Sequence, residues 1–234
     1  SVSIEARFLY GAPASGQRLE GEVILTPTRE MPGRAGYTFG LADEQIYPDR
    51  ASLPDGLETD GEGRVQFVPA LPDLQATTAG YRARIVTRLV EAGGRFVERN
   101  LELAVLADGP RIGVKPAFDG GVEEGGPAEF DILTVAASGE RMAAEGVSWS
   151  LSKLDTRYQW YRSDSRWSYE PVTTSRRVES GTLDIDADAP ARLSVPVDWG
   201  RYRLEVSGPD MATSVEFNAG WYVSSASSQT PDVL

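Results

Sequence analysis

The side chains with the clearest potential for chemistry are three aspartates in an alternating run. Asp184, Asp186 and Asp188 have the spacing of the first, third and fifth ligands of a calcium-binding loop. Such a loop needs a glycine at its sixth position and a glutamate at its twelfth, where this sequence has Ala189 and Val195. Two interpretations stay open: a degenerate calcium loop, or solvated carboxylates at the end of a strand.

A second acidic cluster, formed by Asp55, Glu58, Asp60 and Glu62, is the densest in the chain. The carboxylates and free carbonyl groups of one loop can bind a hard cation. The same stretch contains Asp-Gly and Gly-Glu-Gly steps, which are typical of tight turns. The cluster therefore predicts either a cation-binding loop or a turn at the edge of a sandwich.

Most catalytic mechanisms are excluded by composition. The chain has no cysteine and no histidine, which excludes disulfides, thiolate chemistry, Cys/His zinc sites and histidine-based triads. A pair of catalytic carboxylates needs one cleft and two different pKa values, and spacing along the chain cannot supply either. No Gly-x-Ser-x-Gly or phosphate-binding glycine loop is present. We predict no enzyme activity, no cofactor, and no catalytic, cofactor-binding or metal-ligating residue.

Residues 158–169 are unusually rich in aromatic side chains. Tyr158 and Trp160 fall on one predicted strand, Trp167 and Tyr169 fall on the next, and residues 163–165 form the turn between them. Cross-strand aromatic packing explains this composition. The alternative is a set of exposed rings that stack on a sugar.

The net charge argues against a nucleic-acid partner. The 234 residues include 23 Lys plus Arg and 35 Asp plus Glu, giving a formal charge of −12. Such a surface repels phosphate, and the basic residues are scattered rather than clustered.

No apolar run approaches the roughly 18 residues needed to span a bilayer. The first residues match neither a signal peptide nor a lipid-attachment sequence, so we expect a mature protein or an internal fragment.

The elements that carry these residues are predicted to be strands throughout. Alternating apolar residues at 2–10 and 19–25 suggest one hairpin, residues 81–90 and 95–106 give the clearest hairpin, and residues 26–60 predict loops and short edge strands. No window shows a helical apolar period. After Asp108-Gly109-Pro110 the pattern restarts, with expected strands at 111–115, 128–135, 147–151, 177–185, 191–197, 201–207 and 213–217.

The predicted fold class is all-β, with two consecutive antiparallel β-sandwiches. Residues 1–107 form the first domain and residues 108–223 the second, while the polar residues 224–234 form a linker to further chain. In the second domain we expect Trp149, Trp199 and Tyr202 to support the core.

Several segments, in their order along the chain, resemble the bacterial branch of the alpha-2-macroglobulin and complement family. Together they cover most of the chain. They are Ala6-Arg7-Phe8-Leu9-Tyr10-Gly11, Leu19-Glu20-Gly21-Glu22-Val23, Tyr158-Gln159-Trp160-Tyr161, Trp167-Ser168-Tyr169-Glu170, Asp198-Trp199-Gly200-Arg201-Tyr202 and Gly220-Trp221-Tyr222-Val223.

This resemblance implies two seven-stranded macroglobulin-type domains, roughly the third and fourth of the family's array. It implies a longer, monomeric periplasmic protein, held at the inner membrane through an N-terminal lipid that this fragment lacks. In that family a protease cuts a bait segment and is then trapped. The implied partners are neighbouring domains of the same polypeptide and the target proteases.

Two departures from the family pattern limit what this piece can do alone. The family's Cys-x-Glu-Gln thioester motif has no match, because the chain has no cysteine, and no segment is identified as the bait. The first domain also begins at a strand that an earlier strand usually precedes in the family, which leaves an edge exposed or incomplete. No functional residue of the family transfers to a numbered position.

Three hypotheses follow. The first is a non-enzymatic scaffold module of a protease inhibitor. The second is a binding module of a cell-envelope protein that recognises a glycan or another protein through residues 158–169. The third is an enzyme, which would require a deep pocket lined by at least two acids with raised pKa values.

Metal binding can be tested directly. We expect the thermal midpoint of the chain to be the same with calcium and with EDTA, because neither acidic cluster has a complete ligand pattern. Melting curves in the two buffers make the measurement. A calcium-dependent rise of several degrees would show that one of the clusters binds the ion.

Overall fold

The computed structural model describes residues 1–90, 93–105, 109–163 and 166–220, and for residues 158–171 it describes only the backbone. Its sixteen strands fall into two compact units, and no described residue is helical. Unit 1 comprises Ser1–Pro32 and Gln45–Ala107, and unit 2 comprises Gly33–Glu44 and Asp108–Leu234. Over the described ranges, a search for a helix suited to crossing a membrane finds none.

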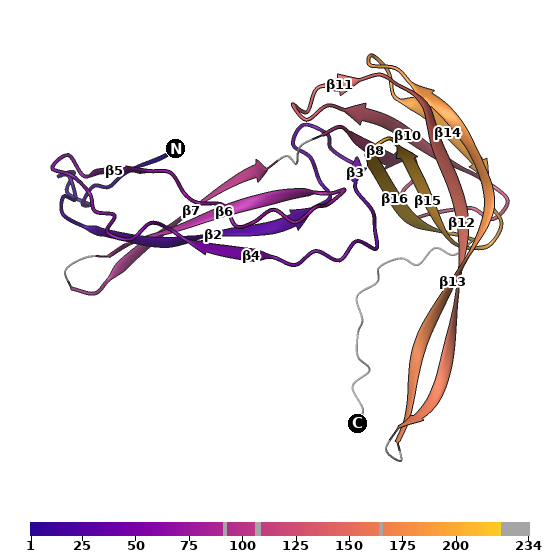
Figure 1. The fold of residues 1–234 in the computed structure, drawn as a ribbon, viewed down its shortest axis with the longest axis horizontal. Helices are drawn as coiled ribbons and strands as arrows, with labels where there is room; N and C mark the ends of the chain where they lie inside the picture. Colours follow the sequence, from indigo (N-terminus) through magenta and orange to yellow (C-terminus); the bar gives the residue numbers. More distant parts are fainter. Residues whose placement is uncertain (91–92, 106–108, 164–165, 221–234) are drawn as a thin grey trace. The chain divides into compact units, whose positions relative to one another are not determined.

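Unit 1 is built on a four-stranded antiparallel sheet with a two-stranded sheet beside it (Figure 1). The large sheet has the order β4-β2-β6-β7, with β4 at Asp49–Ser52, β2 at Arg18–Thr28, β6 at Gly80–Val90 and β7 at Phe96–Val105. The small sheet pairs β1, Val2–Glu5, with β5, Arg64–Phe67. The core joins both sheets, and its buried members are Leu19, Val23, Leu25, Leu53, Val65, Phe67, Tyr81, Ala83 and Ile85.

The first predicted hairpin of unit 1 is wrong and the second is correct. β1 ends at Glu5 and pairs with β5, not with β2. The backbone turns back after Phe8, whose N–H donates to the Ala12 carbonyl at 2.9 Å, so the alternating apolar pattern runs past the strand and leaves Tyr10 exposed. The hairpin of β6 and β7 matches residues 81–90 and 95–106 closely.

Unit 2 is a sandwich of two five-stranded sheets. One sheet runs β11-β10-β8-β3 with β14 on β10, and contains Thr38–Phe39 (β3), Arg111–Pro116 (β8), Pro127–Val135 (β10), Arg141–Met142 (β11) and Ala191–Pro196 (β14). The other runs β13-β12-β15-β16-β9 and contains Gly121–Val122 (β9), Ala144–Ser163 (β12), Arg166–Ile185 (β13), Gly200–Gly208 (β15) and Met211–Ala219 (β16). All pairs are antiparallel except that of β16 with β9.

An aromatic cluster fills the middle of the sandwich. The rings of Phe130 on β10 and Phe217 on β16 lie 5.3 Å apart, and Phe118 lies about 5.5 Å from each. Tyr202 stacks on Phe217 at 5.6 Å. Because one ring comes from each sheet, this cluster joins the two layers directly.

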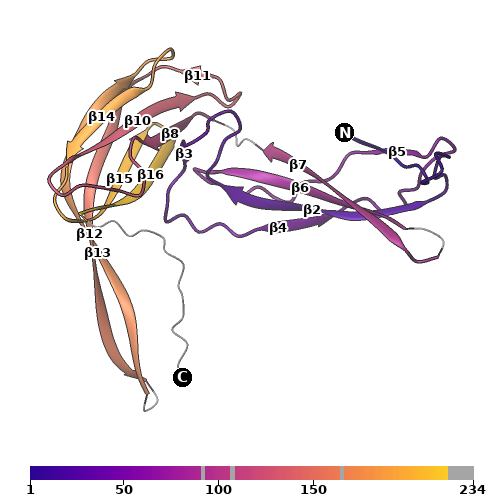
Figure 2. The ribbon, with the colours of Figure 1, turned by 180° about the vertical axis from the view of Figure 1, so that it is seen from behind.

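Strands β12 and β13 continue beyond the sandwich as a two-stranded arm (Figures 1 and 2). β12 pairs with β15 only from Ser148 to Leu154, whereas its pairing with β13 runs on to Ser163 and Arg166. The aromatic residues predicted to form a hairpin lie in this arm, with Trp160 opposite Tyr169 in the backbone register. Their side chains lie outside the described part of the structure, so the choice between packing and sugar binding stays a prediction.

The prediction of a three-residue aromatic core is partly wrong. Tyr202 is buried, with 3% of its surface exposed, and Trp149 packs partly buried against the core. Trp199 is 51% exposed. It precedes the first residue of β15, so its ring lies outside the sandwich, against the backbone at Gly220.

We expect Tyr202→Ala to lower the free energy of unfolding by about 3–5 kcal/mol, because it removes a ring enclosed by the core. Trp199→Ala should cost less than about 1 kcal/mol, because half of that side chain is already in water. Urea unfolding of the two variants makes the comparison. Equal losses would contradict the burial difference.

Candidate functional site

The candidate site is built around a segment that packs in one unit, although its neighbours in the sequence belong to the other unit. Gly33–Glu44, which we call the strap, belongs to unit 2, although the residues on both sides of it belong to unit 1. The chain therefore passes between the units three times: before Gly33, after Glu44 and after Ala107. The predicted first domain, residues 1–107, includes the strap.

The strap joins unit 2 first through a short strand. Thr38 and Phe39 pair with Val114 and Gly113 at the edge of β8. Phe39 is 1% exposed, and a Cβ atom at Gly113 would lie 2.7 Å from its ring. The absence of a side chain at Gly113 therefore makes the space that the Phe39 ring occupies.

Two buried hydroxyl side chains of β16 hold the next part of the strap. Thr213 is fully buried, and its Oγ1 accepts a hydrogen bond from the Gly40 N–H at 2.9 Å while donating to the Ile112 carbonyl at 2.6 Å. The neighbouring Ser214 Oγ accepts from the Ala42 N–H at 2.8 Å, and the Ser214 N–H donates to the Gly40 carbonyl at 3.2 Å. These bonds fix the backbone of the strap at the buried Gly40 and at the more exposed Ala42.

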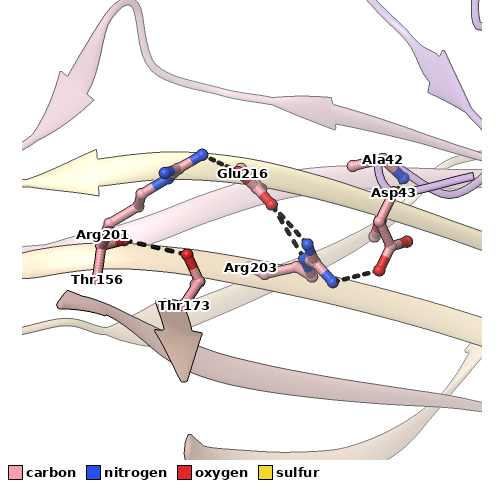
Figure 3. Close-up of polar contacts among 8 residues, drawn as sticks. Ala42, Asp43, Thr156, Thr173, Arg201, Arg203 and Glu216 are labelled. Atoms are coloured by element: carbon pink, nitrogen blue, oxygen red, sulfur yellow. Dashed lines mark hydrogen bonds and ion pairs between the residues drawn. The ribbon is translucent and has the colours of Figure 1, made fainter. Parts of the chain in front are cut away.

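An ion-pair network completes the attachment (Figure 3). Arg203 donates to the Glu216 Oε1 from Nη2 at 2.8 Å and from Nε at 3.1 Å, and to the Asp43 carboxylate of the strap from Nη1 at 2.8 Å. Arg201 donates to the other Glu216 oxygen at 2.5 Å. Arg203 thus bridges a strand of the sheet and the strap.

The network shifts the pKa values of Glu216 and Arg203. Burial alone would raise the pKa of Glu216, but hydrogen bonds from Arg203 and Arg201 and their positive charges lower it below its usual value. The hydrogen bond to Glu216, assisted by the charge of Asp43 and opposed by burial, raises the pKa of Arg203. Both shifts favour the ionised forms of Glu216 and Arg203.

This arrangement holds the strap in a fixed position and offers no reactive group. Its members are hydroxyls that are engaged in hydrogen bonds and charges that are already paired. What the site can do is hold a distant segment of chain against the sandwich of unit 2.

The predicted acidic sites lie elsewhere. The Asp60 carboxylate accepts hydrogen bonds from the N–H groups of Glu62 at 3.0 Å and Arg64 at 2.8 Å, so it shapes the turn before β5. Asp184 accepts from the Gly146 N–H at 2.7 Å. Across the described ranges, no group of three or more Asp, Glu, His or Cys residues is placed to hold a metal ion.

The chain is similar to known proteins over almost its whole length. Residues 1–106 match the model for the bacterial alpha-2-macroglobulin MG5 domain, and residues 113–221 match that for bacterial macroglobulin domain 6. The chain belongs to the bacterial alpha-2-macroglobulin family. The family resemblance is thereby confirmed, although the matching models are the fifth and sixth domains instead of the third and fourth.

Relatives with known sequences and structures agree with this assignment. Alpha-2-macroglobulin of Xylella fastidiosa strain 9a5c is 30% identical over 94% of this chain, which spans 14% of that relative's length. Among solved structures, the native conformation of Escherichia coli alpha-2-macroglobulin has a TM-score of 0.74 at 30% identity, covering 93% of this chain and 15% of that one. The same protein activated by porcine elastase has a TM-score of 0.73 at 31% identity, covering 94% and 20%.

The placement of the strap could not be predicted from the sequence, because its contacts are distant in the chain. Gly40 and Thr213 are 173 residues apart, and Asp43 and Arg203 are 160 apart. The single local signal is a short apolar stretch, residues 37–39, within a segment rich in glycine and proline. Such a stretch predicts a short edge strand without indicating which sheet receives it.

We expect Thr213→Val to lower the free energy of unfolding of unit 2 by about 2–4 kcal/mol. The change keeps the side-chain shape but leaves the Gly40 N–H and the Ile112 carbonyl without this partner. Thr173→Val is the matched control, because the Thr173 hydroxyl is exposed and bonds to the exposed Thr156 at 3.2 Å, and should cost less than about 0.5 kcal/mol. Urea unfolding that gives the same loss for both variants would contradict the role of Thr213.

The ion-pair network predicts a pH dependence of stability. Because folding lowers the pKa of Glu216, its contribution is complete above its unfolded pKa of about 4.3 and is lost as the pH falls through the folded value. The difference in unfolding free energy between wild type and Glu216→Gln should be constant from pH 7 to 5 and shrink toward pH 3. Urea titrations at these pH values measure it, and a difference that grows on acidification would contradict the sign.

Proposed function

We propose that this chain is a two-domain scaffold segment of a bacterial alpha-2-macroglobulin that inhibits proteases by trapping them after bait cleavage. The observation that carries the proposal is the consecutive match of residues 1–106 and 113–221 to two domain models of that family. In this proposal residues 1–106 and 113–221 are each one macroglobulin-type domain, and the chain itself is not an enzyme. Its role is to hold and orient the rest of a longer polypeptide.

The structure gives three physical supports for a scaffold role. Unit 2 has a continuous core between its sheets, including the cluster of Phe118, Phe130 and Phe217. The strap fixes a segment of the first family domain to that sandwich through buried hydrogen bonds. The native and elastase-activated forms of the E. coli relative match this chain almost equally, with TM-scores of 0.74 and 0.73. These similar scores support a region whose fold changes little on activation, as a scaffold requires.

The location and partners follow from the same proposal. The parent protein would be a monomer in the periplasm, attached to the inner membrane by an N-terminal lipid. The partners of this segment would be neighbouring domains of the same polypeptide, and target proteases would be partners of the complete protein only. The formal charge of −12 is consistent with the absence of a nucleic-acid partner.

The test compares the complete polypeptide with this chain. Incubated with elastase or trypsin, the complete protein should suppress cleavage of a large protein substrate while leaving cleavage of a small peptide substrate largely intact, because a trapped protease is shielded only from large molecules. The isolated chain should suppress neither reaction. A complete protein that leaves protein cleavage unchanged, or an isolated chain that inhibits by itself, would overturn the proposal.

A further inference from the structure

A cleft of about 460 Å³ opens in unit 2 where the arm leaves the sandwich. Lys153, Asp155 and Thr156 at the base of the arm line one side, and Trp199, Arg201 and Asn218 line the other. We call it the arm-base cleft. With 51% of its surface exposed, Trp199 is the largest apolar side chain in it. An exposed tryptophan beside cations is typical of the residues that dominate binding at protein interfaces.

The Trp199 ring is held in place by its surroundings. Lys153 Nζ donates to the Trp199 carbonyl at 2.5 Å and lies 5.9 Å from the centre of the Trp199 ring and 5.7 Å from that of Tyr202. A Cβ atom at Gly220 would lie 2.5 Å from Trp199 Cδ1, and one at Gly200 would lie 2.5 Å from Lys153 Cε. The two glycines therefore allow this close packing, and a ring ordered before binding loses little entropy on binding.

The chain leaves the described sandwich at the rim of this cleft. Asn218 and Ala219 line it, and Gly220 packs against Trp199. The register places Asn218 opposite Arg201, which is opposite Leu154, so the exit lies two strands, or about 10 Å, from the base of the arm. The chain that continues beyond Gly220 therefore begins at the rim of the cleft.

Among the described residues, the arm consists of two strands. From Asp155 to Ser163, β12 pairs only with β13 within the described part of the chain. A two-stranded hairpin without a third strand or a second layer is marginally stable in water. A surface that packs at the base of the arm would support both the arm and the Trp199 ring.

We propose that the arm-base cleft docks a domain that follows Leu234 in the same polypeptide, with Trp199 as the central contact. This inference rests on the proposed function, because it needs the longer chain that a 14% coverage of the relatives implies. The cleft has two cations, Lys153 and Arg201, and one carboxylate, Asp155, within a chain of net charge −12. The docked surface should therefore place an apolar side chain on Trp199 and a carboxylate near Lys153.

Hydrogen–deuterium exchange tests this contact. In the complete polypeptide, the backbone amides of residues 153–157 and 199–203 should exchange at least tenfold more slowly than in the isolated 234-residue chain. Trp199→Ala in the complete polypeptide should remove most of that difference. Tyr47→Ala, which truncates an exposed aromatic ring of unit 1, is the control and should leave it unchanged. Trp199→Ala should change exchange little in the isolated chain, which separates lost docking from damaged folding.

Three outcomes would overturn the inference. The first is equal exchange in the complete polypeptide and the isolated chain. The second is self-association of the isolated chain that Trp199→Ala abolishes in sedimentation, which would assign the cleft to a second copy. The third is protection of the cleft by a soluble envelope oligosaccharide in the isolated chain, which would assign it to a glycan. If the complete protein inhibits elastase while exchange is unchanged, the docking inference alone fails; if it does not inhibit, the proposed function fails.

Discussion

The buried hydroxyl of Thr213 is the contact on which the structure of unit 2 depends most. It accepts from Gly40 in the strap and donates to Ile112 at the start of β8, so one side chain joins three separate stretches of chain. Phe39 and Gly40 are the buried part of the strap, and Thr213 and Ser214 hydrogen-bond to the backbone of Gly40 and Ala42 beyond the two residues of β3. The outer ion pairs of Arg203 then act on a segment that is already positioned.

The strands of this protein could be predicted from its sequence, but several of their partners could not. Alternation located β6 and β7 and even their pairing, because a short turn joins them. The same alternation extended the first strand to Tyr10 and paired it with the wrong neighbour, since a period of two reports a face and not a partner. β12 and β13 were predicted as shorter pieces, because the polar residues of the arm interrupt the apolar pattern without ending the strands.

The burial of individual aromatic side chains could not be predicted from the sequence either. Tyr202 and Trp199 are three positions apart and have similar apolar bodies, yet one packs in the core and the other lies in a cleft. The difference depends on Gly200, which begins β15, and on Gly220, which leaves room for the indole. Neither glycine marks a site when it is read alone. The site could not be predicted because its geometry requires strands β12, β15 and β16 to be assembled first.

Because of the strap, the compact units of the structure differ from the domains that the family models define. The two family models divide the chain between residues 106 and 113, whereas the compact units exchange residues 33–44 across that division. A second domain cut out at residue 113 would lose Phe39 from beside Gly113 and the strap groups that bond to Thr213 and Arg203. It would expose apolar surface and remove the hydrogen bonds of the buried Thr213 hydroxyl to Gly40 and Ile112, and both effects oppose folding. The second domain therefore needs residues 33–44, which the family models assign to the first.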